Sequence, residues 1–179
     1  MSATVKDYVD VTRRLDRPAF VERHPHPFLI RRSQNQSLAP RDEYSSTLRM
    51  RIDPDTRQWR AEPTPPSPVD RVLPVVKRDE HSSFASKVLV GRTETNDLVV
   101  SHLTVSKHHA FFTLDADSGT TSLTDTGSTN GSQVNGQVLP PRKPRRLHDG
   151  DQVAFGDIEY LFYTAGGLYD VLTSLTALR

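Results

Sequence analysis

The chain has 179 residues, which suits one domain plus an extension or two small domains. Its net charge of +1 supplies no global field to attract nucleic acid or anionic lipid, so any anion recognition must come from a local site. Cysteine is absent, which excludes disulfides and thiolate metal sites and suits a reducing, cytoplasmic compartment. The charged first thirty residues predict no signal peptide, and no apolar run is long enough to predict a membrane span.

The first 70 residues are expected to be the looser part of the chain. Hydrophobic residues make up only 35% of the sequence, and most of its 13 prolines lie in the first half. A short helix is predicted over Ala19–Arg23, started by Asp16 with Pro18 in its first turn. The apolar run Phe28–Ile30 is typical of a strand, and Glu62–Pro68 predicts a polyproline-like linker or an exposed loop.

From residue 72 onward the chain consists of short strand-like runs separated by turns. The runs are Val72–Val76, Lys87–Val90, Asp97–Val100, Ala110–Leu114, Thr121–Thr124, Gln152–Phe155 and Ile158–Tyr163. Asp117–Gly119, Asn135–Gly136 and Phe155–Asp157 are turn sequences. Many short strands at this spacing predict an all-β sandwich or barrel.

The last segment has the pattern of an amphipathic helix that begins near Gly166–Gly167. Apolar side chains recur at the spacing i, i+3, i+4, i+7 and i+10, which places on one helix face Leu168, Val171, Leu172, Leu175 and Leu178. The favoured interpretation is that this face packs against the sandwich. The alternative is a helix that binds a partner.

Three short polar stretches occur where strand-like runs break into turns. They are Val90–Arg92, Val105–Ala110 and Gly127–Ser132. Together they offer a guanidinium, an ammonium, hydroxyls, an amide and flexible glycine backbone, which is a suitable donor set for a phosphate ester. They contain no nucleophile–base pair, P-loop or zinc-binding motif, so neither catalysis nor a metal or other cofactor is expected.

These stretches also carry a family resemblance, because six short motifs occur in a fixed order. They are Gly91-Arg92, Asn96-Asp97, Ser106-Lys107-His108-His109, Ser128-Thr129-Asn130-Gly131-Ser132, Asn135-Gly136 and Gly150-Asp151. The segment Gly91–Gly156 thereby closely resembles a forkhead-associated (FHA) domain, of the small stand-alone type typical of bacteria. The resemblance implies an all-β, two-sheet FHA/SMAD-like β-sandwich with its binding loops at one end.

The same resemblance implies a division of the chain into four parts. Residues 1–26 would be a partly irregular N-terminal extension, and 27–71 a first strand with a Pro-rich insertion or linker. Residues 72–164 would be the FHA domain, and 165–179 a short C-terminal helix.

The function implied by the resemblance is phosphothreonine-dependent peptide binding in a Ser/Thr kinase pathway. The partner would be a phosphothreonine-containing protein, such as a kinase or its substrate, and neither a membrane nor nucleic acid is an expected partner. The residues that match the family's phosphopeptide contacts are Arg92, Ser106, Lys107, Thr129 and Asn130. In the family the arginine, serine and threonine serve the phosphate, and the asparagine bonds the peptide backbone. Lys107 replaces a frequent arginine and offers a point charge instead of a fork.

Other matched residues are expected to shape the loops. The structural positions are Gly91, His109, Gly131, Asn135 and Gly136, of which His109 braces a loop and Gly131 and Gly136 allow positive φ. Asp125 and Ser128 are expected to brace the second loop, and His108 to be a surface residue. Thr104 matches a specificity position, where an arginine would favour aspartate three residues after the phosphothreonine; threonine does not supply that charge.

Three other functions remain open at this level. The first is a phosphate-independent scaffold or oligomerisation domain that uses the sandwich face or the C-terminal helix. The second is nucleic-acid binding through the basic run Arg142–Arg146, although its proline and its lack of aromatic neighbours favour a solvated loop. The third is an enzyme, for which the sequence offers no catalytic constellation.

Overall fold

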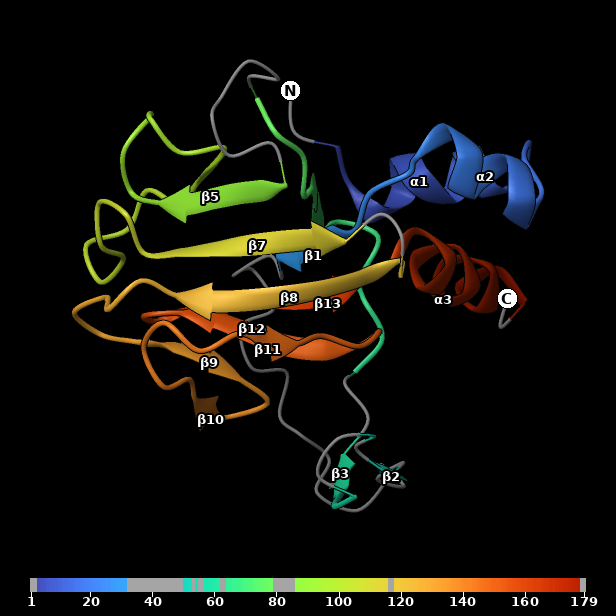
Figure 1. Ribbon diagram of the computed structural model, residues 1–179. Helices are drawn as coiled ribbons and strands as arrows, with labels where there is room; N and C mark the ends of the chain where they lie inside the picture. The colour runs from blue at the N-terminus through green and yellow to red at the C-terminus, as the bar shows by residue number, and fades with distance from the viewer. Residues whose placement is uncertain are drawn as a thin grey trace.

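Two β-sheets pack face to face, and three helices cover the outer face of one of them (Figure 1). The computed structural model describes residues 3–31, 50–52, 54, 57–61, 64–78, 86–115 and 118–177. The two-sheet β-sandwich predicted from the sequence is confirmed.

The first sheet has six strands. In spatial order they are Gln137–Val138 (β10), Ser132–Val134 (β9), Asp151–Phe155 (β12), Ile158–Tyr163 (β13), Phe28–Arg31 (β1) and Arg71–Pro74 (β4). All of its neighbouring strands are antiparallel. The predicted strand at Phe28–Ile30 is therefore confirmed, and β4 pairs with it across the insertion.

The second sheet has five strands. In spatial order they are Arg145–Arg146 (β11), Thr120–Asp125 (β8), Ala110–Asp115 (β7), Lys87–Gly91 (β5) and Leu98–Val99 (β6). Only β5 and β6 pair in parallel. The prediction of a solvated loop at Arg142–Arg146 is wrong for its second half, because Arg145 and Arg146 pair with β8 as an edge strand.

The first sheet is buried on both faces along β1 and the end of β13, where it lies between the second sheet and the helices, whereas its edge strand β10 is exposed. On β1, Leu29 packs into the core between the sheets, whereas Phe28 and Ile30 pack toward the helices. On β13, Phe162 packs into the core between the sheets and Leu161 packs toward the helices. A strand buried on both faces carries a continuous apolar run instead of alternating polar residues.

A layer of three helices lies on the outer face of the first sheet: Val5–Thr12 (α1), Arg17–Arg23 (α2) and Ala165–Ala177 (α3) (Figure 1). Leu168 and Leu172 of α3 are fully buried in this layer. The interpretation that α3 packs inward is therefore confirmed for these residues, while Leu178 lies outside the described residues.

The N-terminal segment is packed, so the expectation that it would be the looser part is wrong for residues 5–23. Val5 of α1 and Phe20 of α2 are fully buried, and each such side chain contributes about 1.5–3 kcal/mol of burial. Low average hydrophobicity concealed these few well-placed apolar groups. The short helix predicted over Ala19–Arg23 is confirmed as α2. Asp16 caps it by accepting a hydrogen bond from the Ala19 backbone N–H (3.0 Å).

The described parts of the insertion contain one small sheet and a coil. Met50–Ile52 (β2) pairs antiparallel with Trp59–Ala61 (β3). The expected Pro-rich segment has neither helix nor strand from Thr64 onward, but Pro66 within it is buried; Glu62 and Pro63 lie outside the described residues. Within the described ranges, no helix is long and apolar enough to cross a membrane, and no cluster of acidic and histidine side chains is placed to hold a metal ion.

Candidate functional site

A hollow of about 430 Å³, hereafter the first hollow, lies at one end of the sandwich. It is lined by residues that follow β5, β6 and β8: Arg92, Leu103, Thr104, Val105, Ser106, Lys107, His108, Thr129 and Asn130. The structure therefore brings together Thr104 and all of the expected phosphopeptide contacts. Their binding roles stay predictions.

The centre of the first hollow is a contact between its two polar loops. Ser106 Oγ accepts a hydrogen bond from the Thr129 backbone N–H (3.1 Å) and lies 3.4 Å from the Thr129 hydroxyl. Two hydroxyls that are distant in sequence thus stand side by side. Such a pair offers short, adaptable donors to an anionic oxygen.

Two cations flank these hydroxyls. Arg92 and Lys107 are exposed, and neither side chain forms a hydrogen bond or an ion pair with any residue that the structure describes. Arg92 is fixed through its backbone, because its N–H donates to the Ser106 carbonyl (2.9 Å). Both charges therefore remain available to a ligand.

Gly91 allows β5 to approach the Lys107 loop closely. A Cβ at this position would lie 2.2 Å from the Lys107 carbonyl oxygen and 2.7 Å from Asn96 Nδ2. Asn96 is buried, and its side-chain amide donates to that same carbonyl oxygen (2.7 Å). The paired Gly-Arg and Asn-Asp motifs thus set the backbone that carries Lys107.

His109 joins the two loops from below. Its ring is fully buried; Nδ1 accepts a hydrogen bond from the Ser106 N–H (3.0 Å), so Nε2 carries the proton and donates to the Gly131 carbonyl (3.1 Å). Burial lowers the pKa of His109, which favours this neutral form. These are the contacts expected of a loop brace. His108, expected only as a surface residue, is exposed but also lines the first hollow.

Asp125 organises the second loop. Its carboxylate accepts hydrogen bonds from the backbone N–H groups of Gly127 (2.7 Å) and Ser128 (2.9 Å), and from the hydroxyls of Ser128 (2.7 Å) and Ser132 (2.6 Å). Burial alone would raise the pKa of Asp125, but these hydrogen bonds outweigh it and lower the pKa. The bracing roles expected for Asp125 and Ser128 are present in the structure.

Thr104, the expected specificity residue, lines the first hollow and forms several hydrogen bonds within the protein. Its hydroxyl lies 2.8 Å from His102 Nδ1 and accepts a hydrogen bond from the Asp157 N–H (3.0 Å). Its carbonyl accepts from the Asn130 side-chain amide (2.8 Å). The neighbouring Leu103 is instead 88% exposed at the rim of the first hollow. Sequence reasoning missed Leu103, because nothing local signals which side chain of this loop turns outward.

The Asn135–Gly136 turn lies between β9 and β10, away from the lining of the first hollow. Gly131 and Gly136 have φ values of 75° and 77°, which confirms the predicted positive φ. Asn135 Oδ1 accepts from the Gln152 N–H (2.9 Å), so this residue joins the turn to β12.

The geometry defines a β-sandwich with loops at one end that gather two exposed cations and two adjoining hydroxyls, and comparison with known proteins gives its family. The FHA domain model matches residues 88–156. The oxoglutarate dehydrogenase inhibitor of Corynebacterium efficiens is 30% identical over 100 residues, which cover 53% of this chain and 67% of that protein. The chain belongs to the FHA domain family, whose domains are binding modules.

Two further curated relatives are much longer. The ABC transporter ATP-binding/permease protein Rv1747 of Mycobacterium tuberculosis is 40% identical over 75 residues, 42% of this chain and 8% of the relative. The transcriptional regulatory protein EmbR of the same species is 33% identical over 86 residues, 48% of this chain and 21% of the relative. The chain therefore spans only a small part of both proteins.

Solved structures similar to this one are also FHA proteins. Mycobacterium tuberculosis EmbR in complex with a low-affinity phosphopeptide has a TM-score of 0.40 and 31% identity, covering 45% of this chain and 20% of that chain. The N-terminal FHA domain of S. cerevisiae Rad53p, in complex with a phosphothreonine peptide, has a TM-score of 0.45 and 21% identity. The match covers 55% of this chain and 88% of that chain.

Proposed function

We propose that this domain is a non-enzymatic module that binds phosphothreonine-containing proteins in Ser/Thr kinase signalling. The observation that carries the proposal is a pair of cations, Arg92 and Lys107, that have no side-chain partner among the described residues and lie beside the adjoining hydroxyls of Ser106 and Thr129. The partner would be a kinase or one of its substrates. The cytoplasmic location expected from the sequence belongs to the same proposal.

The charge and shape of the ligand fit this cluster. Phosphothreonine carries about −1.5 to −2 charges at pH 7 and three strong acceptor oxygens. A guanidinium can donate two parallel hydrogen bonds to such a group, and the ammonium of Lys107 adds a second positive charge. The peptide backbone would then lie across the exposed Asn130, whose side-chain oxygen accepts no hydrogen bond from the described residues.

Preorganisation makes binding less costly. His109 and Asp125 already hold both loops in place, so little conformational entropy is lost when a ligand arrives. Family membership supports the same function.

The test begins with a phosphothreonine-oriented peptide library, which supplies a ligand for calorimetry. Arg92→Ala removes a charge-assisted bond of about 1.5–3 kcal/mol, so affinity should fall roughly ten- to a hundredfold without loss of the fold. Arg14→Ala, an exposed arginine at the helical layer, is the control and should leave affinity unchanged. Equal affinity in both variants, or equal binding of the unphosphorylated peptide, would refute the proposal and favour the phosphate-independent scaffold.

A further inference from the structure

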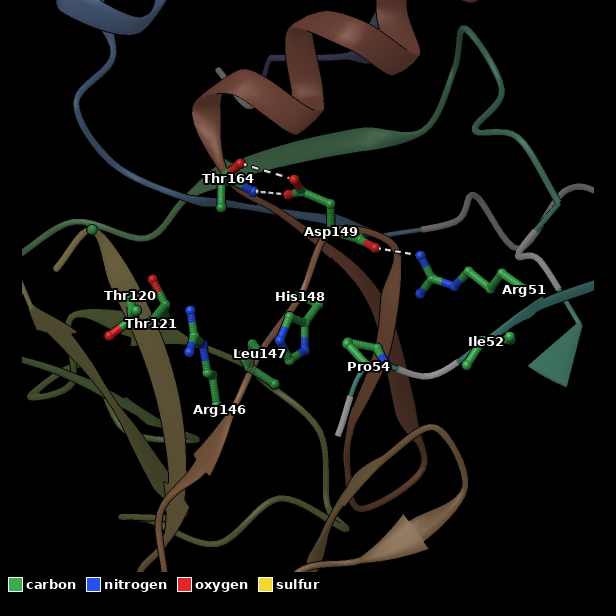
Figure 2. A pocket seen from close by; sticks show the side chains of 11 residues that line it. Arg51, Ile52, Pro54, Thr120, Thr121, Arg146, Leu147, His148, Asp149 and Thr164 are labelled. Carbon is green, nitrogen blue, oxygen red and sulfur yellow. Dashed lines mark hydrogen bonds between the residues drawn. The ribbon is translucent and has the colours of Figure 1, made fainter. Parts of the chain in front are cut away.

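A second hollow, of about 420 Å³, lies where β8 begins (Figure 2). Its polar lining comes from four separate segments: Arg51 of β2, Thr120 and Thr121 of β8, Arg146 with His148 and Asp149 at and after β11, and Thr164 after β13. The first hollow begins beyond Asp125, at the other end of β8. The five steps along β8 from Thr120 to Asp125 span roughly 16 Å, so the two hollows are separate sites.

Arg146 is the unpaired cation of the second hollow. It is exposed, and its guanidinium makes no hydrogen bond or ion pair within the described part of the chain. It extends beside Thr120 and Thr121, with the His148 ring across the space from it (Figure 2). A planar guanidinium near hydroxyls is suited to a carboxylate or a phosphate.

Arg51 adds a third basic side chain and fixes the wall that the insertion contributes. Its guanidinium donates to the Asp149 carbonyl (2.5 Å), as Figure 2 shows, and also lies 3.4 Å from Asp151 Oδ1. These contacts attach β2 to the loop between β11 and β12.

The nearby carboxylates do not neutralise Arg146. Asp149 turns its carboxylate to Thr164, where it accepts from the backbone N–H (2.5 Å) and the hydroxyl (3.1 Å) (Figure 2). Asp151 is buried and accepts from the His148 backbone N–H (2.9 Å) and the Asn135 side-chain amide (3.2 Å). Among the described residues, Arg146 is therefore the cation of the second hollow that has no carboxylate partner.

We propose that the second hollow is an oxyanion-binding site for a carboxylate or phosphate group on a small organic body. The oxyanion lies beside the Arg146 guanidinium and the Thr120 hydroxyl, because Arg146 pairs with Ser122 and Ser122 shares its face of β8 with Thr120. Ile52 and Leu147 line the same space and supply apolar contact for the ligand's body. The site also assigns a role to the second half of the basic run, which the first hollow does not use. It acts independently of phosphothreonine binding.

The test is a titration of the full chain with inorganic phosphate and, separately, with glutarate, followed by ¹H–¹⁵N NMR. Chloride is varied to keep ionic strength constant, because exposed charges are screened by salt. Saturable shifts are expected at the amides of Thr120, Thr121 and Arg146 with at least one probe. Response to phosphate or to glutarate alone identifies which oxyanion the site prefers, and either response supports the site.

Matched variants separate a site from general charge attraction. Arg146→Gln should weaken binding about tenfold or more, while Arg142→Gln, in the same basic run but outside the second hollow, should leave it unchanged. Arg146→Lys keeps the positive charge but loses the planar guanidinium, so its affinity for the probe should lie between those of the wild type and Arg146→Gln. Arg92→Gln should remove only phosphate shifts around the first hollow. No saturable shift with either probe, or equal weakening by the 146 and 142 variants, would overturn the proposal.

Discussion

The strongest structural prediction concerns Asp125, which ends β8 and holds the second loop of the first hollow. The side chain is about 1% exposed and accepts four hydrogen bonds. Two substitutions test separate parts of its role. Asp125→Ala removes every acceptor and leaves the buried Ser132 hydroxyl without its partner, whereas Asp125→Asn keeps the shape of the side chain, removes its charge and replaces one acceptor oxygen by an amide donor.

The size of the stability loss expected for each variant follows from the hydrogen bonds that it removes. Each bond to a charged group contributes about 1.5–3 kcal/mol, but bonds that share one carboxylate are not additive. Asp125→Ala should therefore lower the free energy of unfolding by about 3–5 kcal/mol, less than four separate contributions. In Asp125→Asn the side-chain oxygen keeps both backbone N–H donors, and the hydroxyls can rotate to accept from the new amide. That variant should lose only charge assistance, about 1–2 kcal/mol.

Acid titration gives an independent check on the same carboxylate. Its pKa is lowered in the folded protein, below the ordinary value of 3.8, so the unfolded chain takes up the proton first as pH falls. The stability that Asp125 contributes is complete above pH 3.8 and is lost as pH falls from 3.8 through the folded pKa. The difference between wild type and Asp125→Asn should therefore shrink in acid.

Urea denaturation of the wild type and both variants, at about pH 7 and about pH 3, measures these differences. Phosphopeptide affinity at neutral pH reports whether the loop keeps its shape in the Asn variant. A loss in Asp125→Ala no larger than in Asp125→Asn would refute the hydrogen-bond argument. A gap between wild type and Asn that stays constant across pH would refute the pKa argument.

Three further predictions follow from the site and the core. A phosphothreonine peptide should bind about fourfold tighter than its phosphoserine equivalent, because one buried methyl contributes about 0.8 kcal/mol; equal affinities in calorimetry would exclude a methyl pocket. Gly91→Ala should cost about 1–3 kcal/mol of unfolding free energy, because its Cβ would overlap the Lys107 carbonyl, and an unchanged melting temperature would contradict this. Burial lowers the pKa values of His24, His26 and His109, so the unfolded chain protonates first and stability should fall as pH drops below 6.5; equal denaturation midpoints at about pH 7.5 and 5.5 would contradict it.

The residues of the first hollow were predictable because each motif is a local turn. Gly131 must take a positive φ, and Ser106 and Thr129 each sit in a short polar segment between strands. Such segments are recognisable without any knowledge of distant contacts. Such segments do not reveal which way each side chain points. The Thr104 hydroxyl accepts a hydrogen bond from the backbone N–H of Asp157, which lies 53 residues away in sequence, while the neighbouring Leu103 is exposed.

The first helix shows a different limit. Thr4 and Asp7 form the contacts of a helix start, with the carboxylate accepting from the Thr4 backbone N–H (2.8 Å) and hydroxyl (2.8 Å). A Thr-x-x-Asp pattern resembles a capping box, so the sequence does contain a local signal for the start of this helix. The helix nevertheless depends on tertiary burial: eight residues are too few for a stable isolated helix, and Val5 is buried against the sheet layer.

The two hollows explain why one site could be anticipated and the other could not. The first is assembled around motifs whose spacing is visible along the chain. The second joins Arg51 to Thr121 and Arg146, three positions that share no motif and meet only because β8 pairs with β11 and β2 docks on the adjoining loop. In the sequence, Arg146 is one cation in a basic run. Only the register of β11, which pairs Arg146 with Ser122, places it beside the start of β8 and distinguishes it from Arg142.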